Sequence, residues 1–187
     1  MDFRKSSKIK AYLKSFNFYN LASFYVIWYL CILGASFHFE KIAIVCSLLL
    51  VVLHFLLSKT RKCDALYLVV MTLIGFFADE FFLYFSIIKY PAETLVWNIL
   101  GVPGWLLMLY VGFSTTMNHS LLFVGKYQYL SAFVGGFGAA VYYYLVSLRG
   151  VINFPLGVFS LIIIGIYWAL LIGLAKPFQS FISQRFE

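Results

Sequence analysis

The sequence predicts an all-α membrane protein: a polytopic bundle of six transmembrane helices with both termini in the cytoplasm. Three observations predict it, namely an extreme hydropathy, regularly spaced apolar segments and a one-sided distribution of cations. Of the 187 residues, 63% are hydrophobic and 11% are charged, whereas soluble domains carry about 25% charged residues. A chain of this length and composition is predicted to form one membrane-embedded domain without a second large module.

Six apolar segments are long enough to be considered as membrane spans, since a span needs about twenty apolar residues. They cover residues 18–38, 41–58, 64–86, 100–124, 128–148 and 156–175. The loops between them are short, which makes neighbouring helices antiparallel. The predicted division is a basic cytoplasmic N-terminal segment (1–17), the transmembrane domain (18–175) and a cytoplasmic C-terminal tail (176–187).

The cations decide the orientation of these spans. Eleven lie in the two tails and in the loops on the same side, and the other side carries only Lys41, Lys89 and Arg149. Cytoplasmic loops carry the excess of Lys and Arg, so both termini are predicted to be cytoplasmic. The net charge of +7 is therefore interpreted as an orientation signal, and the expected partners are membrane lipids and other membrane proteins, with no nucleic acid. The apolar run 18–37 is longer than a signal-peptide core and is predicted to be a retained first helix.

One polar cluster is predicted near the cytoplasmic ends of the second and fourth spans. Thr115, Asn118 and His119 would share one helical face, Thr116 adjoins them, and His54 lies a few residues from the same surface. His119 and Asn118 are the catalytic candidates, with the other three as binding residues, because histidine is suited to proton transfer or metal ligation. No carboxylate is expected in this layer, so no metal site is predicted. Hydrogen bonding between helices is the structural alternative.

Asp79 lies deep in the third span, about 22 Å from its cytoplasmic edge at ~1.5 Å per residue. A carboxylate at that depth is costly and indicates a functional site, with a structural pair as the alternative. The run Tyr142–Tyr144 reaches the same level, so we expect a cluster of Asp79 with a tyrosine such as Tyr143, near Trp105. His119 belongs to the other layer, and an Asp79–His119 dyad is therefore disfavoured. A broken or re-entrant fourth span, which Pro103 and Gly104 would permit, is the one arrangement that could still bring them together.

Small residues recur at four-residue spacing in the last two predicted spans, which is typical of closely packed helices. They are Ser131, Gly135 and Ala139 in one span and Gly165, Ala169 and Gly173 in the other. Packing within the bundle is favoured over a dimer interface. The three cysteines form neither a disulfide framework nor a CxxC motif.

The chain resembles the DUF2878 family of small bacterial inner-membrane proteins over most of residues 17–175. The matching residues are Asn20…Trp28…Gly34-Ala35, Gly75…Asp79, Pro103-x-Trp105, Ser114-Thr115-Thr116-x-Asn118-His119-Ser120-Leu121, Gly135-Gly136…Tyr142-Tyr143 and Trp168. Gly138-Ala139 stands where the family pattern has a glycine-proline pair. The resemblance implies a multi-pass protein of the bacterial inner membrane and marks Asp79 and Asn118-His119 as recurrent polar positions. It implies no reaction, although members often accompany lipid-modifying genes.

Three function classes remain open, and the sequence does not decide whether the protein is an enzyme or which cofactor it uses. The first is a membrane partner or scaffold in lipid modification, which would have Asp79 and His119 fully satisfied and no cavity. The second is a membrane-embedded enzyme acting on lipids through His119 and Asn118, which would have a cytoplasm-facing pocket that is lined by His119 and opens sideways to lipid. The third is a small proton-coupled carrier, which would have polar lining on both sides of Asp79.

Overall fold

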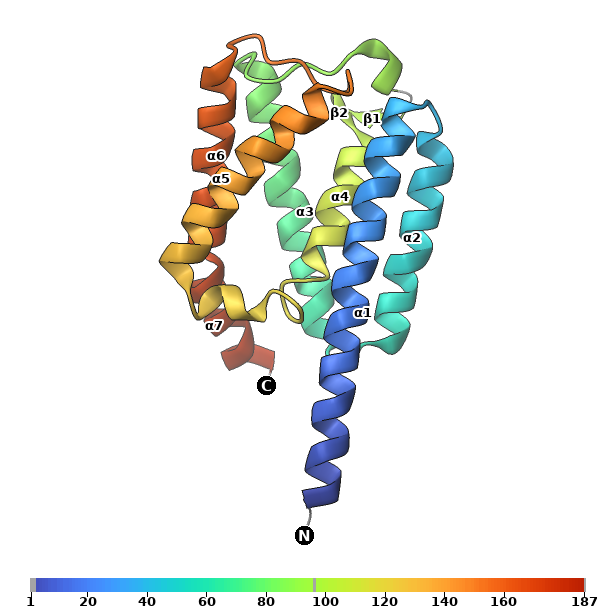
Figure 1. Ribbon diagram of the computed structural model, residues 1–187, viewed down its shortest axis with the longest axis vertical. Coiled ribbons are helices and arrows are strands. Elements are labelled where there is room, and N and C mark those ends of the chain that lie inside the picture. The colour runs from blue at the N-terminus through green and yellow to red at the C-terminus, as the bar shows by residue number, and fades with distance from the viewer. Residues whose placement is uncertain (1–2, 96, 187) are drawn as a thin grey trace.

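The chain folds into a helical bundle with short connections, as Figure 1 shows. The computed structural model describes residues 3–95 and 97–186. The helices there are α1 (Phe3–Ser36), α2 (Glu40–Leu57), α3 (Arg61–Tyr84), α4 (Gly104–Ser114), α5 (Gln128–Ser147), α6 (Val158–Gly173) and α7 (Ala175–Phe186). The predicted all-α class is confirmed. The basic N-terminal segment continues the first helix, which is already formed at Phe3.

Five helices are long and apolar enough to cross a membrane. They are Ser15–Ser36, Glu40–Leu57, Arg61–Tyr84, Gln128–Ser147 and Val158–Ile182. Their outward faces carry large exposed apolar side chains such as Leu49, Phe77 and Phe159. Exposed apolar surface on this scale marks a face that contacts lipid or another protein. The count of six crossings and the orientation stay predictions.

The predicted fourth span is wrong in form, because only α4 is α-helical within residues 100–124. At ~1.5 Å per residue its 11 residues reach about 16 Å, roughly half of the ~30 Å hydrocarbon core. A two-stranded pair, β1 (Asn98–Ile99) with β2 (Val102–Pro103), precedes it. After Ser114 the chain continues in turns. The hydroxyl side chains of Ser114, Thr115 and Thr116 explain why the helix ends here.

Three hydroxyl groups at the end of α4 and directly after it bond to their own backbone. Ser114, Thr115 and Thr116 each donate to the carbonyl oxygen three residues earlier, at 2.6, 2.7 and 2.6 Å. Such bonds compete with the helical hydrogen-bond ladder. All three residues are buried, which is the condition under which irregular backbone is tolerated at membrane depth.

α4 forms the centre of the bundle and packs against α1, α2 and α3 (Figure 1). Its buried residues include Trp105, Leu106 and Tyr110. Gly75 of α3 allows this close approach, since a Cβ there would lie 2.5 Å from Cε1 of Tyr110. The packed centre holds the start of α4 and the irregular segment after it in fixed positions.

α5 and α6 form a second closely packed pair beside this centre (Figure 1). A Cβ on Gly136 would lie 2.5 Å from the carbonyl oxygen of Gly165 and 2.7 Å from Cβ of Ala169. The small residues of the last two spans therefore do pack helix against helix within the chain.

The two ends of the bundle differ. α1 begins and α7 ends at the same end, and the first turns of α1 extend beyond the other helices (Figure 1). The opposite end carries the loops after α3 and α5, which are joined by reciprocal backbone bonds between Lys89 and Asn153 at 2.9 and 2.8 Å. The candidate site described below lies at the end that holds both termini, which we call the terminal end.

Candidate functional site

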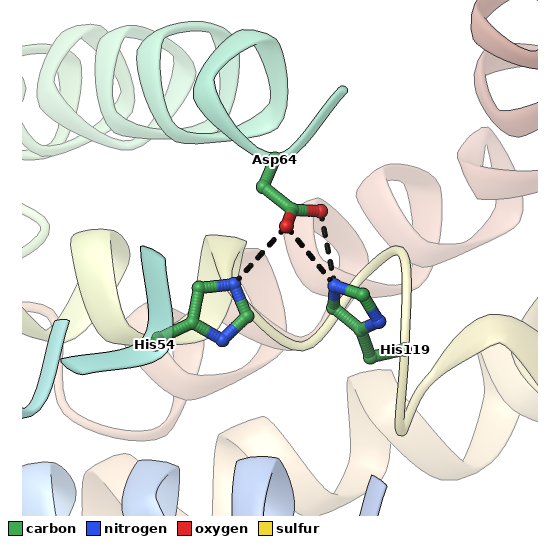
Figure 2. Close-up of side chains that lie close together, drawn as sticks. All are labelled: His54, Asp64 and His119. Atoms are coloured by element: carbon green, nitrogen blue, oxygen red, sulfur yellow. Dashed lines mark hydrogen bonds and ion pairs between the residues drawn. The ribbon is translucent and has the colours of Figure 1, made fainter. Parts of the chain in front are cut away.

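Three side chains from separate elements converge at the terminal end of the bundle (Figure 2). His54 comes from the last turn of α2, Asp64 from the first turn of α3 and His119 from the irregular segment after α4. His119 Nε2 lies 3.0 and 3.1 Å from the two oxygens of Asp64, and His54 Nε2 lies 3.3 Å from Oδ2. The exposed fractions of the three side chains are 2% for His54, 1% for Asp64 and 9% for His119.

The short connection between α2 and α3 explains why two of these residues meet. α2 ends at Leu57 and α3 begins at Arg61, so the connection makes the two helices antiparallel neighbours. Its hydroxyl groups also hold the carboxylate. Ser58 Oγ donates to Asp64 Oδ2, and Thr60 Oγ1 donates to Oδ1 at 3.2 Å. A carboxylate in the first turn of a helix is stabilised further by the helix dipole.

Asn118 completes the set of hydrogen bonds on the carboxylate. Its Nδ2 donates to Asp64 Oδ1 at 3.0 Å. The nearest arginine in sequence is used elsewhere, since Arg61 donates to the carbonyl oxygens of Ser58 and Leu56. In the described part of the chain, both ion pairs of Asp64 are thus to imidazoles. A buried carboxylate must be paired or hydrogen-bonded, and here two histidines, an amide and hydroxyl groups meet that requirement.

Asn20 of α1 determines which ring nitrogen of His54 carries the proton. Its Nδ2 donates to the carbonyl oxygen of Thr115 at 3.0 Å and lies 3.2 Å from His54 Nδ1. Its Oδ1 accepts from Ser120 Oγ at 2.6 Å. Because the amide nitrogen only donates, His54 Nδ1 acts as the acceptor and the proton of the neutral ring is on Nε2, facing Asp64.

The same three residues offer a possible ligand set for a metal ion. Their ligand atoms all lie within 4.8 Å of one another, and two histidines with a carboxylate are a known zinc-binding combination. A histidine that binds metal usually donates its other ring nitrogen to an acceptor. His54 instead accepts from Asn20, so the donor set fits a hydrogen-bonded cluster better than a metal centre. The absence of a metal stays a prediction.

His119 differs from His54 in what its second nitrogen faces. Figure 2 shows Nδ1 of His119 directed away from Asp64. The ring is held by Phe16 and His54, whose ring centroids lie 4.8 and 5.2 Å from that of His119. When Nε2 donates to the carboxylate, Nδ1 retains its lone pair. A carboxylate that orients an imidazole in this way prepares it to accept a proton.

The predicted site residues are brought together only in part. His54, Asn118 and His119 meet, whereas the hydroxyl groups of Thr115 and Thr116 bond to backbone carbonyls. The prediction that Thr115, Asn118 and His119 share a helical face is wrong, because this segment consists of turns.

The carboxylate at the centre of the cluster was not predicted from the sequence. The expectation that no carboxylate lies in the histidine layer is wrong, since Asp64 contacts both imidazoles. The signal was present, because Asp64 is the first residue of the predicted third span and so belongs to the same membrane surface as His54 and His119. Asn20, which reaches His54 from α1, could not be placed by counting depth alone.

Asp79 lies in a separate buried cluster. Tyr90, which the sequence did not predict as a partner, donates to Asp79 Oδ1 at 3.2 Å. The predicted partner Tyr143 lies close enough to Asp79 to interact with it electrostatically. Tyr90 comes from the loop after α3, and its ring lies 6.2 Å from that of Trp105, which is near this cluster as expected. Burial, followed by the nearby Asp79, raises the pKa of Tyr90 well above its ordinary value, so its hydroxyl stays protonated. Tyr143 is buried too.

The two clusters are far apart. Asp64 and Asp79 belong to one helix, and at ~1.5 Å per residue they are separated by about 22 Å along it. Asp79 Oδ2 has no hydrogen-bond partner among the described residues. A direct proton transfer between Asp79 and His119 is therefore excluded by distance in this structure.

Comparison with known proteins gives a family but no activity. The family model for DUF2878, described as a protein of unknown function, matches residues 17–174. No curated protein matches the chain, and no solved structure matches it. The matched region contains the whole histidine–aspartate cluster and the Asp79 layer.

Proposed function

The chain belongs to the DUF2878 family, and from its site we propose that it is a membrane-embedded enzyme that acts on lipids, with His119 as the general base. The observation that carries the proposal is the pairing of His119 Nε2 with a buried carboxylate at 3.0 Å. Asp64 orients the ring, and Asn118 holds Asp64. In this role Nδ1 of His119 removes a proton from a hydroxyl group or a water molecule at the lipid surface.

The location of the site supports a lipid as the substrate. Five helices of the chain are suited to a membrane, and the cluster lies at one end of them rather than at their middle (Figure 1). The proposed topology is multi-pass in the bacterial inner membrane, with both termini and the site on the cytoplasmic side. The excess of Lys and Arg in the segments assigned to that side supports it.

The scaffold and carrier alternatives predict features that fit less well. A scaffold would leave no cavity, but a cavity of about 380 Å³ lies between α1, α4, α5 and α6, and Asp79 Oδ2 is unpartnered among the described residues. His119 is not among the residues that line this cavity, so the cavity argues against the scaffold and does not by itself support catalysis by His119. A carrier would need polar lining on both sides of Asp79. Asp79 does not line this cavity, and the side chains that do are mostly apolar, such as Phe24 and Leu106, so the cavity supplies no polar path to Asp79.

The test is the lipid composition of a strain that lacks the gene, complemented with defined variants. His119→Gln is the informative variant, because the amide can still donate to Asp64 but cannot act as a base. Asp79→Asn is the matched control, since it changes a buried carboxyl group that lies about 22 Å from Asp64 along α3. Each variant is first shown to accumulate in the membrane to the same level as the wild type.

We expect the wild type and Asp79→Asn to restore the lipid species lost in the deletion strain, and His119→Gln to leave them absent. Restoration by His119→Gln would refute the proposal. Identical lipids in the deletion and wild-type strains would refute it as well.

A further inference from the structure

Two adjoining cavities form a groove between α1 and α4 on one side and α5 and α6 on the other. Their volumes are about 380 and 330 Å³, and each lies within the ~300–1,000 Å³ range of ligand pockets. Both are lined by Phe113, Gly135 and Ile172, so they adjoin each other at these three residues. We call them together the lateral groove.

The walls of the lateral groove suit a hydrocarbon chain. The part nearer the terminal end is lined by apolar residues such as Met117, Leu121 and Leu130. The inner part ends at Trp28 and Tyr142, whose ring centroids lie 4.7 Å apart. Apolar walls of this kind offer a chain the same environment as the bilayer, with closer packing.

Glycine on α5 keeps the groove open. Gly138 lines the inner cavity, and a Cβ added there would have nothing within 4 Å. Gly136, on the other face of α5, has Gly165 and Ala169 against it. The space beside Gly138 is thus not used for packing between helices of this chain.

A positive charge lies at the terminal end of the groove. Tyr127 lines the groove there, and the adjoining Lys126 is exposed, with its Nζ 5.3 Å from the centroid of the Tyr127 ring. A lysine at a membrane surface attracts anionic headgroups. The charge and the apolar groove together match an amphiphile with an anionic head and a hydrocarbon tail.

The groove also adjoins the histidine–aspartate cluster. Phe24 lines the inner cavity, and Asn20, which contacts His54, lies one turn nearer the terminal end on the same face of α1. Met117 and Leu121 line the outer cavity on either side of His119 in sequence. A chain in the groove would therefore hold its headgroup at the end where His119 lies.

We propose that the lateral groove binds one hydrocarbon chain of an anionic phospholipid, whose phosphate group lies against Lys126. The identification of the bound phospholipid as the substrate of His119 rests on the proposed function. Binding itself does not depend on catalysis and is measured separately.

The test uses phosphatidylglycerol with brominated acyl chains, titrated into the full chain in detergent. Bromine quenches tryptophan fluorescence on contact, and Trp28 and Trp168 line the groove. Trp97 is 62% exposed and is replaced by phenylalanine in all variants to lower the background. We expect quenching that saturates and is reversed by unbrominated phosphatidylglycerol.

Gly138→Leu is the blocking variant, because its side chain enters open space in the groove. Val141→Leu is the matched control, since Val141 is exposed on α5 and does not line either cavity. We expect about tenfold weaker binding for Gly138→Leu and no change for Val141→Leu. Equal quenching of wild type and Gly138→Leu would overturn the groove as the binding site.

Lys126→Gln tests the headgroup. It should weaken the binding of phosphatidylglycerol and leave the binding of brominated phosphatidylcholine unchanged, whereas equal binding of the two lipids by the wild type would overturn the anionic preference. His119→Gln should bind phosphatidylglycerol like the wild type. If Gly138→Leu loses binding yet restores the lipids of the deletion strain, the assignment of the bound lipid as substrate is overturned, while lipid binding and the role of His119 are not.

Discussion

Replacement of Asp64 by asparagine should destabilise the protein more than any other single change in the histidine–aspartate cluster. The carboxylate accepts at Oδ1 from Asn118, His119 and Thr60, and at Oδ2 from Ser58. His54 Nε2 also lies 3.3 Å from Oδ2. An asparagine keeps one accepting oxygen, so two of these donors would face an NH₂ group. At ~1–3 kcal/mol for each buried group left unpaired, the cost is about 2–6 kcal/mol.

The assay is thermal unfolding of the detergent-solubilised protein, followed by tryptophan fluorescence. Since about 1 kcal/mol lowers the Tm of a chain of this size by ~2–4 °C, Asp64→Asn should lower it by roughly 10 °C. Asp79→Asn is the control, because Asp79 accepts one bond from Tyr90 and its other oxygen is unpartnered among the described residues. Asp79 is the more deeply buried carboxyl group, so an equal or larger loss for Asp79→Asn would refute the reasoning from hydrogen bonds.

Three further substitutions test the packing and the site by the same unfolding measurement. Gly136→Leu should lose about 1–3 kcal/mol by overpacking, because its Cβ would lie 2.5 Å from a carbonyl oxygen of α6; an unchanged Tm would contradict the close contact of α5 and α6. Gly75→Ala should lose a similar amount, since its Cβ meets the Tyr110 ring at 2.5 Å, and a more stable variant would show that α4 can shift. Asn20→Ala should lose about 1–3 kcal/mol by leaving the Thr115 carbonyl and His54 Nδ1 unpaired, and no loss would mean that water replaces the amide.

The long helices could be predicted because hydropathy acts locally. Runs such as 41–58 and 128–148 have no other stable form in a membrane, where every backbone group must be paired within the segment. The fourth span could not be predicted from hydropathy. Its apolar residues were recognised, but Ser114, Thr115 and Thr116 bond to the backbone and end α4, a choice that depends on the burial supplied by the surrounding helices.

The candidate site, too, could be predicted from the sequence only in part. Counting depth along straight helices places His54 and His119 at one surface, and applied to Asp64 it would have added the carboxylate. It does not reveal Tyr90, which reaches Asp79 from a loop whose path no helical rise describes. Contacts between helices joined by short connections can thus be predicted from the sequence, whereas contacts made by loops cannot.

The central claim is that His119 offers Nδ1 to a substrate while Asp64 holds Nε2, and the reactivity of the three histidines towards diethyl pyrocarbonate tests it directly. Exposed His38 is the reference for a fully reactive ring. Buried His54, whose two ring nitrogens both face polar partners, is the reference for a protected ring. Peptide mapping by mass spectrometry gives the rate at each ring in the detergent-solubilised chain. We expect His119 to react more slowly than His38 and much faster than His54. Protection of His119 equal to that of His54 would contradict the central claim.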